Sequence, residues 1–101
     1  MGIYSTRLYS CYKMNILEEA NELIYGDRAV AYGPVSESFG RIARFWSVIL
    51  DKEVTAEQVG LCMVALKMSR QISKAGRGNL VDGAGYFGCI AKMEEEKSQQ
   101  S

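Results

Sequence analysis

Three glutamates stand close together near the start of the chain, at Glu18, Glu19 and Glu22. Side chains three and four positions apart share one face of a helix, so Glu22 is expected to lie beside the other two. Carboxylates grouped in this way can bind magnesium when more oxygen ligands converge on them. A solvated helix face has the same spacing, because the helix dipole favours acids near its N-terminus. The spacing alone favours the solvated face.

Basic residues are concentrated on one later segment, since no acidic residue occurs between Glu57 and Asp82. At about 100° per residue, the first three fall on one narrow arc of a helix, and the fourth follows in a glycine loop. Such cations suit the oxygens of a phosphate. Lys67 and Arg70 could equally form a structural ion network with Asp82, and the sequence leaves both interpretations open. The four cations are Lys67, Arg70, Lys74 and Arg77.

A third polar group lies in the connection between Gly26 and Pro34. There Arg28 could bind a phosphate and Tyr32 could stack on a base. Both residues could also simply hold the turn between two helices. The residues favour neither interpretation.

Four predicted helices must position these groups. The first follows Asn15 as its N-cap and ends at Gly26. Pro34 has the place of the first residue of the second helix. Thr55 opens the third with a capping box in which Gln58 reaches back to the cap.

Apolar periodicity predicts which faces the helices bury. The predicted buried residues are Phe39, Ile42, Ala43, Trp46, Ile49 and Leu50 in the second helix and Leu80, Ala84, Phe87 and Ala91 in the fourth. Asn79 is predicted to cap the fourth helix, which also contains Gly83, Gly85 and Gly88. Each of these glycines costs about 1 kcal/mol relative to alanine, so they predict the close approach of another helix or a ligand.

Short connections between long helices favour antiparallel neighbours, and no segment alternates as a strand would. The sequence therefore predicts an all-α protein, an antiparallel four-helix bundle. Residues 15–93 are predicted to form its single domain. Residues 1–14 would be an N-terminal extension, and residues 94–101 a charged C-terminal tail.

Composition excludes several classes of function. A formal net charge of zero gives no signature of DNA or RNA binding. The absence of histidine excludes zinc sites of the Cys/His kind and histidine-based catalytic triads. The three cysteines are predicted to be reduced thiols of a cytoplasmic protein. No apolar run reaches the roughly 20 residues that a membrane span needs, so no membrane partner is expected.

One combination of motifs is similar to a family of short phage and prophage proteins of unassigned function, and the similarity covers residues 15–93. The motifs are Gly26-Asp27-Arg28, Tyr32-Gly33-Pro34, Glu37-Ser38-Phe39, Arg41-Ile42-Ala43, Trp46, Thr55, Val59, Lys67, Arg70, Asn79-Leu80-Val81-Asp82 and Gly85-Tyr86.

More distantly, the chain resembles the MazG-like all-α nucleoside triphosphate pyrophosphohydrolases, which hold magnesium with an EExxE-type helix and a later ExxD-type helix. Glu18, Glu19 and Glu22 are similar to the first motif, and Asp82 to the second, in which Asn79 replaces a glutamate. The resemblance implies a MazG-like fold, a homo-oligomer and, in an enzyme, magnesium held by Glu19, Glu22 and Asp82. Metal-assisted cleavage of pyrophosphate depends on several carboxylates, so Asn79 favours binding over catalysis.

Three hypotheses follow. The favoured one is a non-catalytic phage protein that needs no cofactor, binds a nucleotide or cyclic nucleotide and sequesters a signal of host antiviral defence. The alternatives are a magnesium-dependent pyrophosphohydrolase with Glu18, Glu19, Glu22 and Asp82 as catalytic residues, and a protein-binding dimer without a nucleotide ligand. The predicted ligand-binding residues are Arg28, Tyr32, Lys67, Arg70, Lys74, Arg77, Asn79, Asp82 and Tyr86.

Overall fold

The computed structural model describes residues 14–26 and 33–100, and within these ranges every regular element is a helix. The helices are α1 (Ile16–Tyr25), α3 (Val35–Leu50), α4 (Ala56–Ser73) and α5 (Arg77–Gln100). This confirms the predicted all-α class. The N-terminal extension and the candidate residues Arg28 and Tyr32 lie outside the described residues.

Capping boxes begin both α1 and α4. The box at Thr55 and the N-cap role of Asn15 confirm the sequence predictions, and the reciprocal contact from Glu18 adds a box at Asn15. The side chain of Asn15 accepts the N–H of Glu18, and the Glu18 carboxylate accepts the N–H of Asn15, both at 2.8 Å. Thr55 and Gln58 make the same reciprocal pair at 3.1 and 3.0 Å. Each box satisfies two backbone N–H groups that a helix N-terminus leaves free. Glu18 therefore acts as a capping residue.

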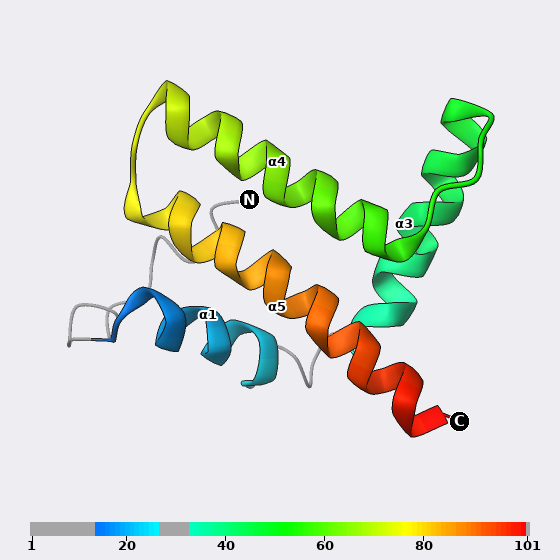
Figure 1. Cartoon of the computed structure of the whole chain (residues 1–101), viewed down its shortest axis with the longest axis horizontal. Coiled ribbons are helices and arrows are strands. Elements are labelled where there is room, and N and C mark those ends of the chain that lie inside the picture. Colours follow the sequence, from blue (N-terminus) through cyan, green and yellow to red (C-terminus); the bar gives the residue numbers. More distant parts are fainter. Residues whose placement is uncertain (1–13, 27–32, 101) are drawn as a thin grey trace.

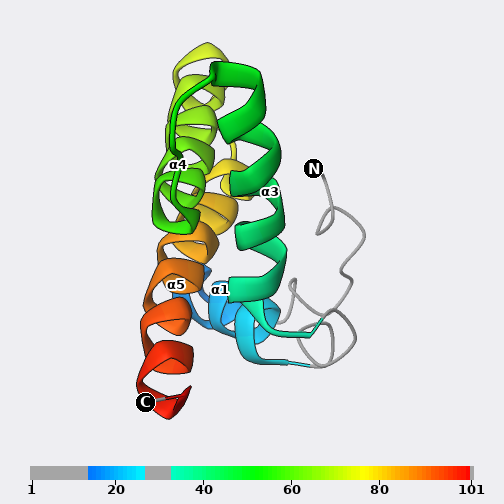
Figure 2. The same cartoon turned by 90° about the vertical axis from the view of Figure 1, so that its right-hand side faces the viewer.

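The helices α4 and α5 form an antiparallel hairpin that is the centre of the fold (Figure 1). α1 lies along α5 and runs in the same direction, so the antiparallel arrangement predicted for the bundle is wrong for this pair. α1 ends and α3 begins beside the last turns of α5, where Tyr25 and Val35 contact Glu95 and Glu96. α3 packs across that end of the hairpin (Figure 2).

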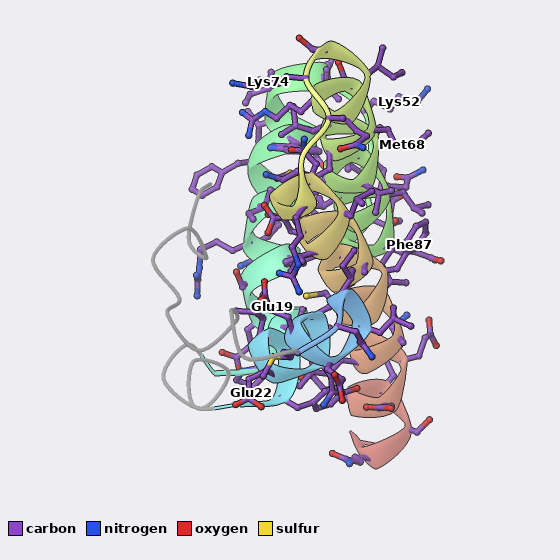
Figure 3. All side chains as sticks on the ribbon, turned by 90° about the vertical axis from the view of Figure 1, so that its left-hand side faces the viewer. Glu19, Glu22, Lys52, Met68, Lys74 and Phe87 are labelled. Carbon is purple, nitrogen blue, oxygen red and sulfur yellow. The ribbon has the colours of Figure 1, made fainter. Side chains whose placement is uncertain are left out.

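Both α1 and α3 lie on the same side of the α4–α5 hairpin (Figures 2 and 3). We call this side the inner face and the opposite side the outer face. No described helix covers the outer face. The molecule is consequently flat, with extents of 42 × 34 × 18 Å.

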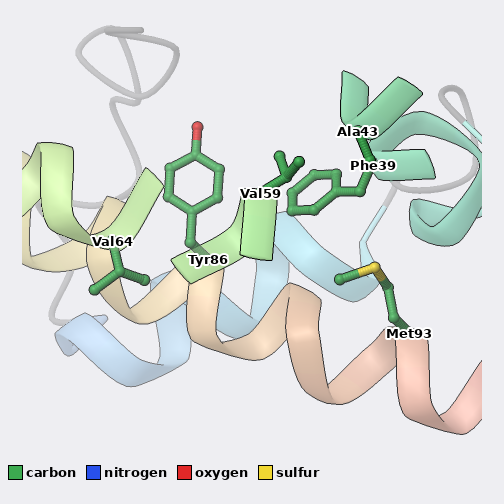
Figure 4. Close-up of a cluster of buried hydrophobic side chains, with 6 residues drawn as sticks. All are labelled: Phe39, Ala43, Val59, Val64, Tyr86 and Met93. Atoms are coloured by element: carbon green, nitrogen blue, oxygen red, sulfur yellow. The ribbon is translucent and has the colours of Figure 1, made fainter. Parts of the chain in front are cut away.

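The hydrophobic core lies where α3 meets the inner face of the hairpin (Figure 4). Val59 of α4 is completely buried, and the rings of Phe39 and Tyr86 lie 6.4 Å apart. These contacts hold α3 against α4 and α5. The buried cluster comprises Phe39, Ala43, Val59, Val64, Tyr86 and Met93.

The predicted core faces are wrong in two places. In α3, Ile49 and Leu50 are 76% and 61% exposed, because α3 extends beyond the hairpin on which its first half packs. In α5, the predicted stripe with Leu80 and Phe87 lies on the exposed outer face. The helix instead buries Val81, Asp82, Tyr86 and Met93. α5 has two apolar stripes, and periodicity cannot tell which of them meets a neighbour.

The end of α5 is also longer than predicted, because residues 94–100 continue the helix instead of forming a separate tail. Glu96 accepts the N–H groups of Val35 and Ser36 at 3.2 and 2.9 Å. Pro34, the N-cap of α3, makes no side-chain cap hydrogen bond. The Glu96 carboxylate on α5 caps α3 instead. Tyr25 donates its hydroxyl to Glu95 at 2.9 Å. These last turns therefore fasten both α1 and α3.

One of the three α5 glycines has a clear packing reason. A Cβ on Gly88 would collide with Cδ1 of Ile24 on α1, so glycine lets these two helices approach. A Cβ on Gly85 would meet nothing within 4 Å, and one on Gly83 would make only ordinary contact. The prediction of intimate helix packing is thus confirmed for Gly88.

Candidate functional site

A buried ion pair joins α4 to α5. Lys67 Nζ lies 2.9 Å from Asp82 Oδ2, and the two side chains are 4% and 7% exposed. The other carboxylate oxygen, Oδ1, is buried and has no hydrogen-bond partner among the described residues. A buried charge needs a partner, and Lys67 supplies only part of what Asp82 requires. The structure thus contains an ion pair of Lys67 and Asp82, which was one of the two interpretations of these residues.

Tyr86 lies one helical turn after Asp82 on α5, and its ring faces α3. Burial, and then the negative charge of Asp82, raise the pKa of Tyr86 to about 12. The nearby cation Arg70 acts in the opposite direction and lowers it. The phenol of Tyr86 therefore stays neutral at physiological pH, beside three charged side chains. Lys67, Arg70, Asp82 and Tyr86 form what we call the inner polar cluster.

A second ion pair ties α1 to the beginning of α5. Arg77 donates to Glu19 at 2.8 Å and to the carbonyl oxygen of Met14 at 2.7 Å. The Glu19 side chain is only 3% exposed, whereas that of Arg77 is 44% exposed. Sequence reasoning missed this pairing because 58 positions separate the partners and no local pattern connects them. Part of the Arg77 side chain therefore remains exposed to solvent beside the turn between α4 and α5.

The three predicted glutamates do not converge. Glu18 is used in its capping box, Glu19 turns inward to Arg77, and Glu22 is exposed. In residues 14–26 and 33–100, no three acidic or cysteine side chains form a group that could hold a metal ion. The two buried carboxylates, Glu19 and Asp82, are each paired with a cation. The described residues therefore do not fit a magnesium site as they are arranged.

Asn79 closes the turn between α4 and α5. Its amide donates to the carbonyl of Lys74 at 3.1 Å and to the side chain of Gln71 at 3.3 Å. Gln71 also accepts the N–H of Gly76 at 3.0 Å. The prediction that Asn79 caps its own helix is wrong, because α5 begins at Arg77 and the amide satisfies the end of α4 instead.

The structure thus groups some of the predicted ligand-binding residues and separates others. Lys67, Arg70, Asp82 and Tyr86 lie together on the inner face, and Arg77 lies at the start of α5. Lys74 is exposed at the end of α4. None of the described helices is long and apolar enough to cross a membrane.

The chain belongs to the family defined by a domain of unknown function, DUF6378, whose model matches residues 15–94. Its relatives include the Gene 55 protein of Mycobacterium phage D29, which is 39% identical over 84 residues, or 81% of this chain and 55% of that protein. The Gene 55 protein of Mycobacterium phage L5 is 39% identical over 83 residues, or 80% of this chain and 53% of that protein.

These comparisons confirm the predicted resemblance to a phage protein family of unassigned function. The chain spans about half the length of the curated relatives it matches. No solved structure matches the chain. The more distant MazG-like resemblance remains a prediction.

Proposed function

We propose that this phage protein binds a nucleotide or cyclic nucleotide at its inner polar cluster without cleaving it. The observation that carries the proposal is the buried Asp82 carboxylate, which keeps one oxygen without a partner in the described part of the chain. An unsatisfied buried acceptor calls for an explanation, and a donor from a ligand is one. Base amino groups and ribose hydroxyls are donors of this kind.

The cations around the cluster suit the phosphate part of such a ligand. Arg70 is exposed on the same arc of α4 as Lys67, Lys74 is exposed at the C-cap of α4, and Arg77 presents nearly half of its side chain to solvent. Guanidinium groups bind phosphate oxygens with two parallel hydrogen bonds. A negatively charged ligand would thus meet exposed cations first and the buried acceptor beyond them.

The same geometry supports binding over hydrolysis. A magnesium-dependent pyrophosphohydrolase needs several carboxylates free to hold the metal. Here Glu19 and Asp82 are paired with Arg77 and Lys67, and Asn79 closes a turn. We therefore favour a protein that sequesters its nucleotide, such as a cyclic nucleotide signal of host antiviral defence, and that acts as a homo-oligomer in the cytoplasm.

Calorimetry with a panel of nucleoside triphosphates and cyclic nucleotides tests the proposal, with magnesium and with a chelator. We expect one ligand class to bind in both conditions without turnover. Binding should be lost in Arg70→Ala and Asp82→Asn and kept in Arg44→Ala, which removes an exposed cation of α3. Pyrophosphate release that depends on Glu19 and Asp82 would establish the enzyme instead. No binding of any nucleotide would favour a purely protein-binding dimer.

A further inference from the structure

The outer face of the α4–α5 hairpin is apolar and exposed. On α4, Leu61, Met68 and Ile72 recur at helical spacing, and Ile72 is 86% exposed. On α5, the matching stripe contains Leu80 and Phe87, of which Phe87 is 56% exposed. Figure 3 shows Met68 and Phe87 on the side away from α1 and α3. The two stripes therefore form one continuous surface.

No exposed charged side chain lies on this surface within the segments 61–73 and 80–91. The cations of α4 in this range are the buried Lys67 and Arg70, which lies on the opposite side of the helix from Met68. The one acid of α5 in this range is the buried Asp82. Large apolar patches without charge are uncommon on monomeric soluble proteins and mark sites of association.

A groove runs between the two stripes and has a volume of about 390 Å³. Its lining is mostly apolar and includes Met68, Ile72 and Phe87, with the polar side chains of Lys67, Gln71 and Asn79 among the other residues. The surface thus offers both protruding side chains and a depression that can receive them. A two-fold symmetric contact needs this combination, because the same patch must supply both sides.

The exposed area approaches that of one partner in a standard dimer. With roughly 200 Å² for a fully exposed large apolar side chain, the exposed fractions of the large side chains sum to about 600 Å², against about 800 Å² per partner in a standard interface. The side chains counted are Leu61, Met68, Ile72, Leu80 and Phe87. We propose that the outer face pairs with the outer face of a second copy of this chain. This locates the interface of the proposed homo-oligomer and does not depend on nucleotide binding.

Sedimentation velocity of the full chain at micromolar concentration tests the interface. We expect the unaltered protein to sediment as two chains. Ile72→Glu and Phe87→Glu should each raise the dissociation constant about 30-fold or more, as loss of a central apolar contact does. Val48→Glu is the matched control, since Val48 is also apolar and 81% exposed but lies on α3. This variant should dimerise normally.

Circular dichroism confirms that each variant is folded, and Ile72→Ser replaces Ile72→Glu if the charge prevents folding. An unaltered protein that sediments as a monomer would overturn the proposal together with the homo-oligomer. A dimer that survives both outer-face variants, or that dissociates in Val48→Glu, would overturn the interface alone and leave the homo-oligomer standing.

Discussion

The buried pair of Lys67 and Asp82 allows a quantitative test of the inner polar cluster. Replacing Lys67 with Met removes the cation and keeps a side chain of similar shape. Replacing Asp82 with Leu removes the carboxylate and keeps its branched shape. Each single variant leaves one charge buried without its partner, whereas the double variant Lys67→Met/Asp82→Leu leaves none.

The burial of the pair sets the expected magnitudes. Because both side chains are less than 10% exposed, each single variant should lower the free energy of unfolding by about 3–5 kcal/mol. The double variant should come within about 1 kcal/mol of the unaltered protein or exceed its stability, because it also removes the unsatisfied Oδ1, which costs about 1–3 kcal/mol. Because the two single variants together cost at least about 6 kcal/mol and the double variant about 1 kcal/mol at most, the coupling energy between the two positions is expected to be about 5 kcal/mol or more.

Urea unfolding followed by circular dichroism measures all four proteins. The difference between the double variant and the sum of the singles gives the coupling energy. Single variants that each cost less than about 1 kcal/mol would refute the reasoning, since that is the range of solvated ion pairs. A double variant as unstable as either single would show that the site requires its charges for folding, and the functional argument from Asp82 would fail.

Three further predictions concern the ends of the helices, their contacts and the buried phenol. Glu96→Gln should cost about 1 kcal/mol in urea unfolding, because it weakens the cap of α3, whereas Glu94→Gln on the exposed side of α5 should cost little. Burial alone would raise the pKa of Glu96, but the hydrogen bonds from Ser36 and smaller effects beside them outweigh burial, and the pKa is lowered. The stabilising effect of the Glu96 carboxylate should therefore be present at neutral pH and lost on acidification. Gly88→Ala should destabilise the protein by about 1–3 kcal/mol through its clash with α1, whereas Gly85→Ala should stabilise it by about 1 kcal/mol, both read from thermal melting. The pKa of Tyr86 is raised to about 12, so the stabilising effect of its neutral phenol should be complete below pH 10 and lost as the pH rises from 10 to 12. Over this pH range, the free energy of unfolding of Tyr86→Phe should therefore fall less steeply than that of the unaltered protein.

Local patterns in the sequence predicted the described helices and the beginnings of α1 and α4 well. The predicted N-cap at Asn15 and the predicted capping box at Thr55 depend on residues close together in the sequence, and both are present in the structure. Gly26 ends α1 as expected, while α3 begins at Val35, one residue after Pro34. Such signals are local, so a single sequence contains them.

The assembly of the helices was less predictable. The stripe containing Phe87 has the periodicity of a core face, yet it is exposed, because α1 and α3 both pack on the other side of the hairpin. The contacts of Arg77 with Glu19 and of Glu96 with α3 span about 60 positions. Pairings of that length depend on how helices meet in space, which residue spacing along one chain does not encode.

The central claim, that the inner polar cluster binds a nucleotide, is tested most directly by calorimetry on Lys67→Met/Asp82→Leu. This variant is expected to be as stable as the unaltered protein, so a change in binding reports on the site and not on the fold. The account predicts that the ligand found with the unaltered protein no longer binds. Unchanged affinity in this folded variant would contradict the account and locate the nucleotide elsewhere.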